Sequence, residues 1–348
     1  MGKRPYNSIR GCLYTELYPF RLWCCPVVGD APLSKDADCG YTAGMQKHLC
    51  NDYLSVTVDT AGAELVSVKT RSHREILWQG EKSVWNAHAP LLFPWTGRIK
   101  NRRFTHKGAA FDAGIHGFIA QTEHRLAQES ADLLRFETES SASTHKLFPY
   151  DFALAQTFSL SASALTHTVD VTNTGKSPMF FGLGFHPGFI CPFEKEKEAG
   201  DYELVFDTAQ SPDLVELTEN GLPSGAQRRY MNNQKALALS DDLFKGNTLC
   251  FTGLMASSVT LREKSAPHKK NRAGYSAGYS VEVCIKDFPY LLLWSAATEK
   301  LRFVCIEPWY TLPDFENASS EWESKKNLLR LESGKTFTAA LTLTIHTV

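Results

Sequence analysis

The stretch Tyr53-Leu-Ser-Val-Thr-Val-Asp59 alternates apolar and polar side chains, and a second run of strand-like sequence extends from Ala63 to Thr70. Successive side chains of a β-strand point to opposite faces, so this alternation is typical of a strand with one buried face. Ala61-Gly62 lies between the two runs and supplies a turn. The stretch therefore predicts a β-hairpin.

Similar short runs continue from about Lys47 to the C-terminus. Strands are expected at residues 133–139, 152–160, 164–172, 179–186, 202–207, 248–252, 257–262, 279–285, 290–295, 301–307 and 336–347. Turn residues separate them, as in Asn173-Thr-Gly175. A helical period is nearly absent, and only Glu321 to Leu331 predicts one short helix. Many short strands without helical crossovers predict an all-β fold, a large antiparallel β-sandwich.

Composition narrows the class of protein. The chain has 348 residues, of which 43% are hydrophobic and 22% charged, and its net charge is −1. These values are ordinary for a soluble globular protein, and an all-β domain of this size often forms a single unit. The balanced charge gives no field that would favour nucleic acid or an anionic membrane as a partner. No apolar run reaches the length of a transmembrane helix.

The cysteines indicate the compartment. There are nine, an odd number, and no two are spaced as CxxC. Several lie inside apolar runs, such as Cys284 in Val281-Glu-Val-Cys-Ile285 and Cys305 in Phe303-Val-Cys-Ile306. This distribution favours buried free thiols in a reducing compartment over disulfides or a metal site. We therefore expect a cytoplasmic protein.

Residues 1–45 differ from the rest of the chain. They mix tyrosine, proline, charges and four of the cysteines without a period, and Glu16 and Arg21 interrupt any candidate signal sequence. Three interpretations are open: an extension that packs on the core, a partly disordered tail, or an upstream start with Met45 as the functional one. We expect one domain over residues 46–348.

Four polar residues interrupt apolar, strand-like runs: Arg98, His116, His186 and Glu307. Leaving a charge unpaired in a dry core costs several kcal/mol, so such residues are paired, solvated in a cleft, or functional. Each alone has a structural explanation; Glu307, for example, could pair with Arg302. Together, a carboxylate, two imidazoles and a guanidinium are the parts of an acid/base site for a polar, uncharged substrate.

Five motifs carry a family resemblance. They are Phe93-Pro-Trp-Thr-Gly-Arg98, His116-Gly-Phe118, Gly184-Phe-His-Pro-Gly-Phe189, Asp287-Phe-Pro-Tyr-Leu291 with Trp294, and Ile306-Glu-Pro-Trp309. In this order they resemble the aldose 1-epimerases (galactose mutarotase-like proteins), in particular the branch named after the lactose-operon protein LacX. The resemblance covers roughly residues 47 to 348 and implies one domain with the family's β-supersandwich fold.

The resemblance also implies a reaction, the interconversion of α and β anomers of an aldose, without a cofactor or metal. Glu307, ionised, would take the proton from the anomeric hydroxyl, and His186, as an imidazolium, would protonate the ring oxygen. Arg98 and His116 would hold sugar hydroxyls, and Trp294 could stack on the sugar. We expect His186 and Glu307 to face each other across one cleft, about a pyranose ring apart.

Two other functions are compatible with these residues. The first is a hexose-6-phosphate 1-epimerase, which would need converging cations such as Lys100, Arg102 and Arg103; we expect these not to converge. The second is a carbohydrate-binding protein of the same fold without turnover. Asp241 and Asp242 lie where family members carry an acidic residue that binds hydroxyls, although their local motif is poor. Neither the identity of the sugar nor the oligomeric state follows from the sequence.

Overall fold

Strand β10 (Ala164–Asn173) shows how the sequence pattern becomes a layer, because its residues alternate strictly between partly exposed and buried. The computed structural model describes residues 44–245, 248–264 and 278–347. Within these ranges the regular elements are β-strands and short 3₁₀ segments, and every pairing between named strands is antiparallel. The predicted all-β class is therefore confirmed.

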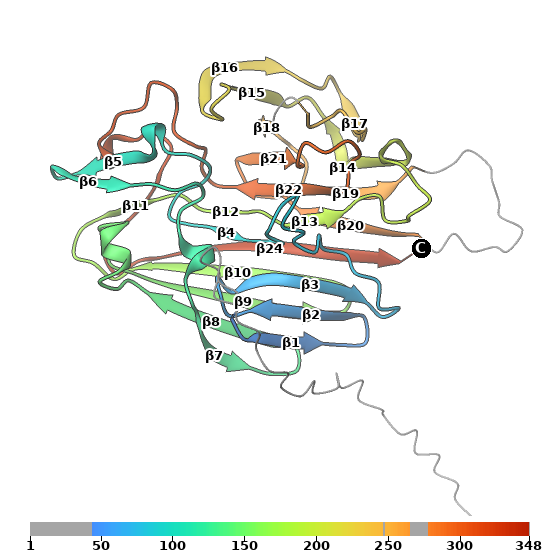
Figure 1. Cartoon of the computed structure of the whole chain (residues 1–348), viewed down its shortest axis with the longest axis horizontal. Coiled ribbons are helices and arrows are strands. Elements are labelled where there is room, and N and C mark those ends of the chain that lie inside the picture. The colour runs from blue at the N-terminus through green and yellow to red at the C-terminus, as the bar shows by residue number, and fades with distance from the viewer. Residues whose placement is uncertain (1–43, 246–247, 265–277, 348) are drawn as a thin grey trace, which may run out of the picture. The chain divides into compact units, whose positions relative to one another are not determined.

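The largest sheet has nine strands, which run in Figure 1 from the upper right to the bottom of the molecule. In spatial order they are β17 (Gln234–Ala238), β14 (Tyr202–Gln210), β19 (Ser258–Glu263), β20 (Tyr279–Cys284), β24 (Thr336–Thr347), β10, β9 (Phe152–Ser161), β8 (Leu133–Glu139) and β7 (Arg125–Glu129). The long strands β9, β10 and β24 form its centre.

The second large sheet has eight strands and runs through the upper half of Figure 1. Its order is β16 (Pro223–Arg229), β15 (Asp213–Leu217), β18 (Leu249–Thr252), β21 (Tyr290–Trp294), β22 (Phe303–Trp309), β12 (Gly184–Phe185) and β4 (Leu91–Leu92), and β13 (Gly188–Ile190) also pairs with β22.

Smaller elements complete the fold. The predicted hairpin is present as β2 (Leu54–Asp59) and β3 (Glu64–Thr70), and β1 (Gln46–Cys50) adds a third strand. Two-stranded sheets pair β5 (Arg103–His106) with β6 (Ala109–Asp112), and β11 (Met179–Phe181) with β23 (Leu329–Leu331). The 3₁₀ segments are Lys100–Arg102, Ile119–Gln121, Thr144–Lys146, Ala199–Asp201 and Trp322–Ser324.

The two large sheets share one hydrophobic core. Val281 and Val283 of β20 belong to the same buried cluster as Val304 and Ile306 of β22. Burial of both inner faces against each other is what stabilises a β-sandwich, and the expected sandwich is therefore confirmed.

No helix within the described residues is long and apolar enough to span a membrane.

The predicted helix over Glu321 to Leu331 is wrong. The segment contains only the 3₁₀ turn Trp322–Ser324 and then strand β23. Individual long-range contacts override the helical pattern: the buried indole of Trp322 donates to the carbonyl of Phe180. Residues 1–43 lie outside the described residues, so the domain boundary near residue 45 stays a prediction.

Candidate active site

The strand register brings His186 and Glu307 together from distant parts of the chain. Gly184 on β12 is paired with Trp309, and Gly188 on β13 is paired with Cys305. His186 lies midway between the two glycines, in the break between β12 and β13. Glu307 lies midway between their two partners on β22, so the register places the imidazole opposite the carboxyl group.

Strand β22 separates core residues from site residues by its alternation. Val304 and Ile306 point into the core between the sheets, whereas Cys305 and Trp309 belong to two separate clusters on the opposite side of the strand. Successive side chains of a strand alternate in direction, so Glu307 points to the same side as Cys305 and Trp309. The site therefore lies on the face of the eight-stranded sheet that is turned away from the core.

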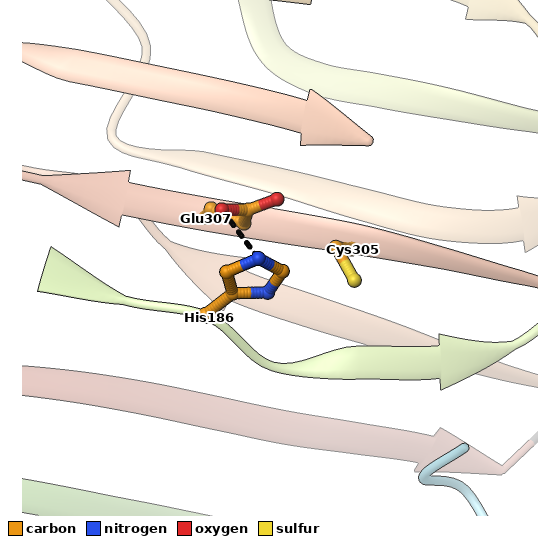
Figure 2. A group of neighbouring side chains, drawn as sticks. All are labelled: His186, Cys305 and Glu307. Carbon is orange, nitrogen blue, oxygen red and sulfur yellow. Dashed lines mark ion pairs between the residues drawn. The ribbon is translucent and has the colours of Figure 1, made fainter. Parts of the chain in front are cut away.

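The two side chains are in direct contact. The distance between Nε2 of His186 and Oε2 of Glu307 is 3.2 Å, and both side chains are buried, at 8% and 2% exposure (Figure 2). The expectation that a pyranose ring would separate them is wrong. The geometry is nevertheless suited to a hemiacetal, because the anomeric hydroxyl oxygen and the ring oxygen are bonded to the same carbon. An acid and a base that serve both oxygens must lie side by side.

Burial disfavours a charge on either partner. Desolvation raises the pKa of Glu307 well above its usual value. Desolvation and, to a smaller extent, the nearby His116 hold the pKa of His186 well below 6.5. Burial therefore favours the neutral form of each group, a protonated carboxyl beside a neutral imidazole. The ionised glutamate and imidazolium that the sequence predicts for the reaction are the forms that burial disfavours.

Part of the pair has no hydrogen-bond partner. Three buried atoms have no hydrogen-bond partner among the described residues: Oε1 of Glu307, Nδ1 of His186 and Nε1 of Trp309. The indole of Trp309 lies close enough to act on the carboxyl of Glu307, but without good hydrogen-bond geometry. Buried polar atoms are nearly always satisfied, so unsatisfied atoms beside a cavity indicate a place for a polar ligand.

A cavity of about 560 Å³ opens onto this pair. Its walls include all five residues that the sequence singled out: Arg98, His116, His186, Trp294 and Glu307. The other lining residues are Trp85, Pro90, Gly97, Ile115, Leu217, Glu219, Asn220, Gly221, Phe244, Lys245, Thr248, Leu292, Ser295, Ala297, Trp309 and Pro313. A volume in this range is typical of small-molecule sites.

His116 has a defined tautomer. Its Nδ1 accepts a hydrogen bond of 3.0 Å from the backbone N–H of Gly97. Burial and the neighbouring Arg98 lower its pKa to about 4. A neutral imidazole that accepts at Nδ1 carries its proton on Nε2, so His116 can offer an N–H donor.

Comparison with known proteins places these features in one family. A family model described as aldose 1-epimerase matches residues 45–343. The plasmid-encoded protein LacX of Lactococcus lactis subsp. lactis is 31% identical over 274 residues, which are 76% of this chain and 87% of LacX. The chain belongs to the aldose 1-epimerase family.

Two solved structures resemble this aldose 1-epimerase family member closely. A galactose mutarotase related enzyme from Lactobacillus acidophilus has a TM-score of 0.79 and 28% identity, and the match covers 87% of this chain and 97% of that one. A galactose mutarotase-like protein from Lactobacillus casei ATCC 334 has a TM-score of 0.78 and 26% identity, over 87% of this chain and 100% of that one. The family's supersandwich fold is therefore shown for this chain.

The other polar candidates lie away from the cavity. Lys100, Arg102 and Arg103 are not among its lining residues, and Arg103 pairs with Asp112 at 3.0 Å. Asp241 accepts a hydrogen bond from the backbone N–H of Leu301 and lines a different hollow. Asp242 pairs with Lys245 at 2.6 Å. A further group of basic residues in the sequence, Lys269, Lys270 and Arg272, lies outside the described residues.

Trp85 is a site residue that the sequence did not reveal. Its ring stacks on His186 with centroids 4.9 Å apart and meets Trp294 edge-on at 5.6 Å. Trp85 lies in an irregular segment before β4, where no periodicity indicates which side chains point inward. No local pattern in the sequence marks Trp85 as a site residue, because only the folded chain brings this loop over β13.

Cys305 also lies next to the catalytic candidates. One ligand atom each of His186, Cys305 and Glu307 lie within 4.8 Å of one another. Figure 2 shows the three side chains as neighbours. The thiol is fully buried, does not line the cavity, and has its pKa raised well above 9 by desolvation. The thiol lies behind the cavity wall and does not face a ligand, so the cluster fits an acid/base pair better than a metal centre.

Proposed function

We propose that this protein is an aldose 1-epimerase that interconverts the α and β anomers of a free aldohexose. The observation that carries the proposal is the contact between His186 and Glu307 at the base of a cavity of small-molecule size. The pair also has unsatisfied polar atoms, and family membership implies a sugar as the ligand.

The reaction needs one proton removed and one added. Glu307, as a carboxylate, takes the proton from the anomeric hydroxyl while Nε2 of His186 protonates the ring oxygen. The C1–O5 bond breaks, its electron pair stays on O5, and C1 becomes an aldehyde. Rotation about C1–C2 turns the other face of the carbonyl toward O5, and the reverse proton transfers close the ring. No net proton, electron or atom is exchanged.

The buried pair matches the charge states of this cycle. Opening the ring starts from a carboxylate and an imidazolium, and it ends with a protonated Glu307 and a neutral His186. The second state is the one that burial favours. Burial therefore drives the pair toward ring opening, while hydrogen bonds to the bound sugar stabilise the charged state before it.

The cavity walls supply the remaining functions of a sugar site. The side chain of Arg98 is exposed to the cavity, and His116 presents an N–H, so both can donate to hydroxyl groups. Trp294 offers an apolar surface beside the pair, and its ring meets that of His186 edge-on at 5.8 Å. A pyranose ring has apolar C–H faces and several hydroxyl groups. A site for it therefore combines an apolar surface with a few well-placed hydrogen-bond donors.

The arrangement of cations favours a free sugar over a sugar phosphate. A phosphate dianion needs at least two converging cations. Two cations, Arg98 and Lys245, line the cavity within the described residues, and Lys245 is already paired with Asp242. Glu219 lines the same cavity and would repel an anion.

The experiment is polarimetry, or NMR saturation transfer, on freshly dissolved α-glucose, α-galactose and related aldoses and on their 6-phosphates. We expect acceleration of mutarotation above the spontaneous rate, with higher kcat/KM for free sugars. Binding without acceleration of any aldose would favour a carbohydrate-binding protein instead. A strong, salt-sensitive preference for the 6-phosphate, lost when Arg102 and Arg103 become Gln, would favour the phosphate-specific enzyme.

A further inference from the structure

A second buried ionisable pair lies outside the proposed acid/base site. Nζ of Lys325 is 2.6 Å from Oδ2 of Asp314, and their side chains are 1% and 2% exposed. The ammonium group also donates to the carbonyl of Ser319 at 2.9 Å and lies 5.9 Å from the centre of the Trp322 ring. Neither residue lines the cavity, and the proposed chemistry uses neither of them.

Such a pair is not needed for stability alone. Moving two charges out of water costs several kcal/mol per ion, and apolar residues of similar volume are often at least as stable in the same place. A buried ion pair is better explained where its directional bonds fix a particular backbone geometry. The contacts of Asp314 identify the backbone concerned.

Asp314 binds the backbone directly after Arg98 through two hydrogen bonds. The backbone N–H of Asp314 donates to the carbonyl of Arg98 at 3.0 Å. Its Oδ2 atom accepts a hydrogen bond from the backbone N–H of Lys100, also at 3.0 Å. These two bonds flank Ile99 and hold the segment that leads from Arg98 into the 3₁₀ segment Lys100–Arg102, which is not part of any sheet. The backbone position from which the Arg98 side chain projects therefore depends on Asp314.

The residues just before Asp314 contact the residues just before Arg98. Pro313 packs so closely on Gly97 that a Cβ atom there would lie 2.3 Å from Cγ of the proline. The hydroxyl of Thr96 donates to the carbonyl of Thr311 at 2.8 Å. Gly97 in turn binds His116 through its N–H. The segment around Asp314 is thus the support on which the Arg98 wall of the cavity rests.

We propose that Asp314, held in place by Lys325, is a positioning residue that fixes the guanidinium of Arg98 at the cavity wall. The inference rests on the proposed function, in which Arg98 binds sugar hydroxyls. Lys325 donates to Oδ2 of Asp314, and the same oxygen atom holds the N–H of Lys100. The pair acts on substrate affinity through Arg98 and does not touch the reacting atoms.

The test is a mutant cycle with three proteins beside the wild type: Arg98→Gln, the double variant Asp314→Asn/Lys325→Met, and the triple variant. Removing both charges together avoids leaving one of them buried and unpaired. We expect Arg98→Gln to raise KM by about 10–100-fold, as for the loss of a hydrogen bond to a charged group. The double variant should raise KM several-fold to about tenfold with little change in kcat.

The triple variant shows whether the pair acts through Arg98 or only supports the fold. If the pair acts through Arg98, adding the double substitution to Arg98→Gln changes KM by less than about twofold. If the pair only supports the fold, its effect multiplies with that of Arg98→Gln, and the inference is wrong. Gln156→Leu is the matched control, because Gln156 is fully buried far from the cavity lining and its loss lowers stability without altering KM.

The two proposals fail in different ways. Sugar binding is also measured by the fluorescence of the cavity tryptophans, Trp85, Trp294 and Trp309. A wild-type protein that neither binds nor turns over any aldose removes the proposed function. Crystal structures of the wild type and the double variant then decide the positioning role: a displaced Arg98 supports it, and an unchanged Arg98 overturns it.

Discussion

Two of the buried groups of polar side chains that contain histidine differ in one respect: one is closed and the other opens onto a cavity. Between the sheets, Gln156 joins His124 and His167: its Oε1 lies 2.9 Å from Nε2 of His167, and its Nε2 lies 3.1 Å from Nε2 of His124. Nδ1 of His124 bonds to the carbonyl of Thr122 at 2.8 Å. At the cavity, by contrast, His186 and Glu307 bond to each other and leave Nδ1 and Oε1 unsatisfied.

The comparison shows which property separates a structural histidine from a site histidine. Burial lowers the pKa of His124 to about 4 and of His167 to about 3, and it lowers that of His186 as well. A perturbed pKa is therefore common to both groups and identifies neither. The difference is hydrogen-bond satisfaction: the first group is closed, whereas the second has free atoms and an open wall.

The largest expected effect contrasts the two groups by mutation. Glu307→Gln keeps the shape of the side chain but removes the exchangeable carboxyl proton, so we expect kcat to fall by about 10²–10⁴-fold with KM nearly unchanged. His186→Asn should act similarly. Because burial raises the pKa of Glu307 and so favours its neutral carboxyl, thermal unfolding of Glu307→Gln should occur close to the wild-type temperature.

The matching variant in the closed group is Gln156→Leu. It leaves the partner atoms of His124 and His167 unsatisfied, so the free energy of unfolding should fall by about 1–3 kcal/mol, with kcat within about twofold of the wild type. Polarimetry and thermal melts on both variants test the contrast. An active Glu307→Gln, or a folded but inactive Gln156→Leu, would reverse the two roles.

The second prediction concerns acid stability. The folded protein protonates His124 only below about pH 4 and His167 only below about pH 3, whereas the unfolded chain protonates both below about pH 6.5. Between these values the unfolded state binds more protons, so stability falls as pH falls. Each group contributes about 1.4 kcal/mol per pH unit across its window.

Chemical denaturation at a series of pH values measures this slope. His167→Phe removes one of the two groups, so its stability should vary less steeply between pH 6.5 and pH 4 than that of the wild type. An equally steep curve in the variant would show that His167 is not neutral in the folded protein.

The sequence singled out residues that the fold brings together at one cavity, but not the contact between His186 and Glu307. Glu307 stood out because a single carboxylate interrupts an apolar strand, and periodicity placed most of the strands. The contact with His186 depends on the pairing of β12 and β13 with β22 across more than a hundred residues, which no local pattern encodes. The proton position followed from burial, which also could not be read from the chain. Trp85 was missed because irregular segments have no period.

The third prediction tests whether Trp85 maintains the state of His186. Its ring stacks on the imidazole at an interplanar angle of 28°, which helps to exclude water. Trp85→Ala should admit water and raise the pKa of His186 toward 6.5. The pair then takes up a second proton at higher pH, and the acid limb of the kcat/KM profile moves upward by up to about one pH unit.

Trp85→Phe is the control, because it keeps an aromatic ring over the imidazole and should leave the acid limb near its wild-type position. The profiles are measured by polarimetry, and NMR titration of the His186 ring protons follows the same ionisation. An acid limb that does not move in Trp85→Ala would mean that other residues set the pKa of His186.

The smallest expected effect comes from Cys305, the third member of the cluster beside the open pair. Its sulfur atom lies behind the cavity wall, where Trp85 and Gly188 pack: a Cβ atom at Gly188 would be 2.7 Å from the Trp85 ring and 3.4 Å from the sulfur. The thiol is neutral there, because burial raises its pKa. It gives neither a charge nor a proton to the reaction.

Cys305→Ala should therefore change kcat and KM by less than about twofold, and a chelator should have no effect on either variant or wild type. If Cys305 were a metal ligand, its removal would instead lower activity strongly, as expected when one of three protein ligands is lost. Activity assays with and without the chelator distinguish a pair that works by proton transfer alone from a metal centre.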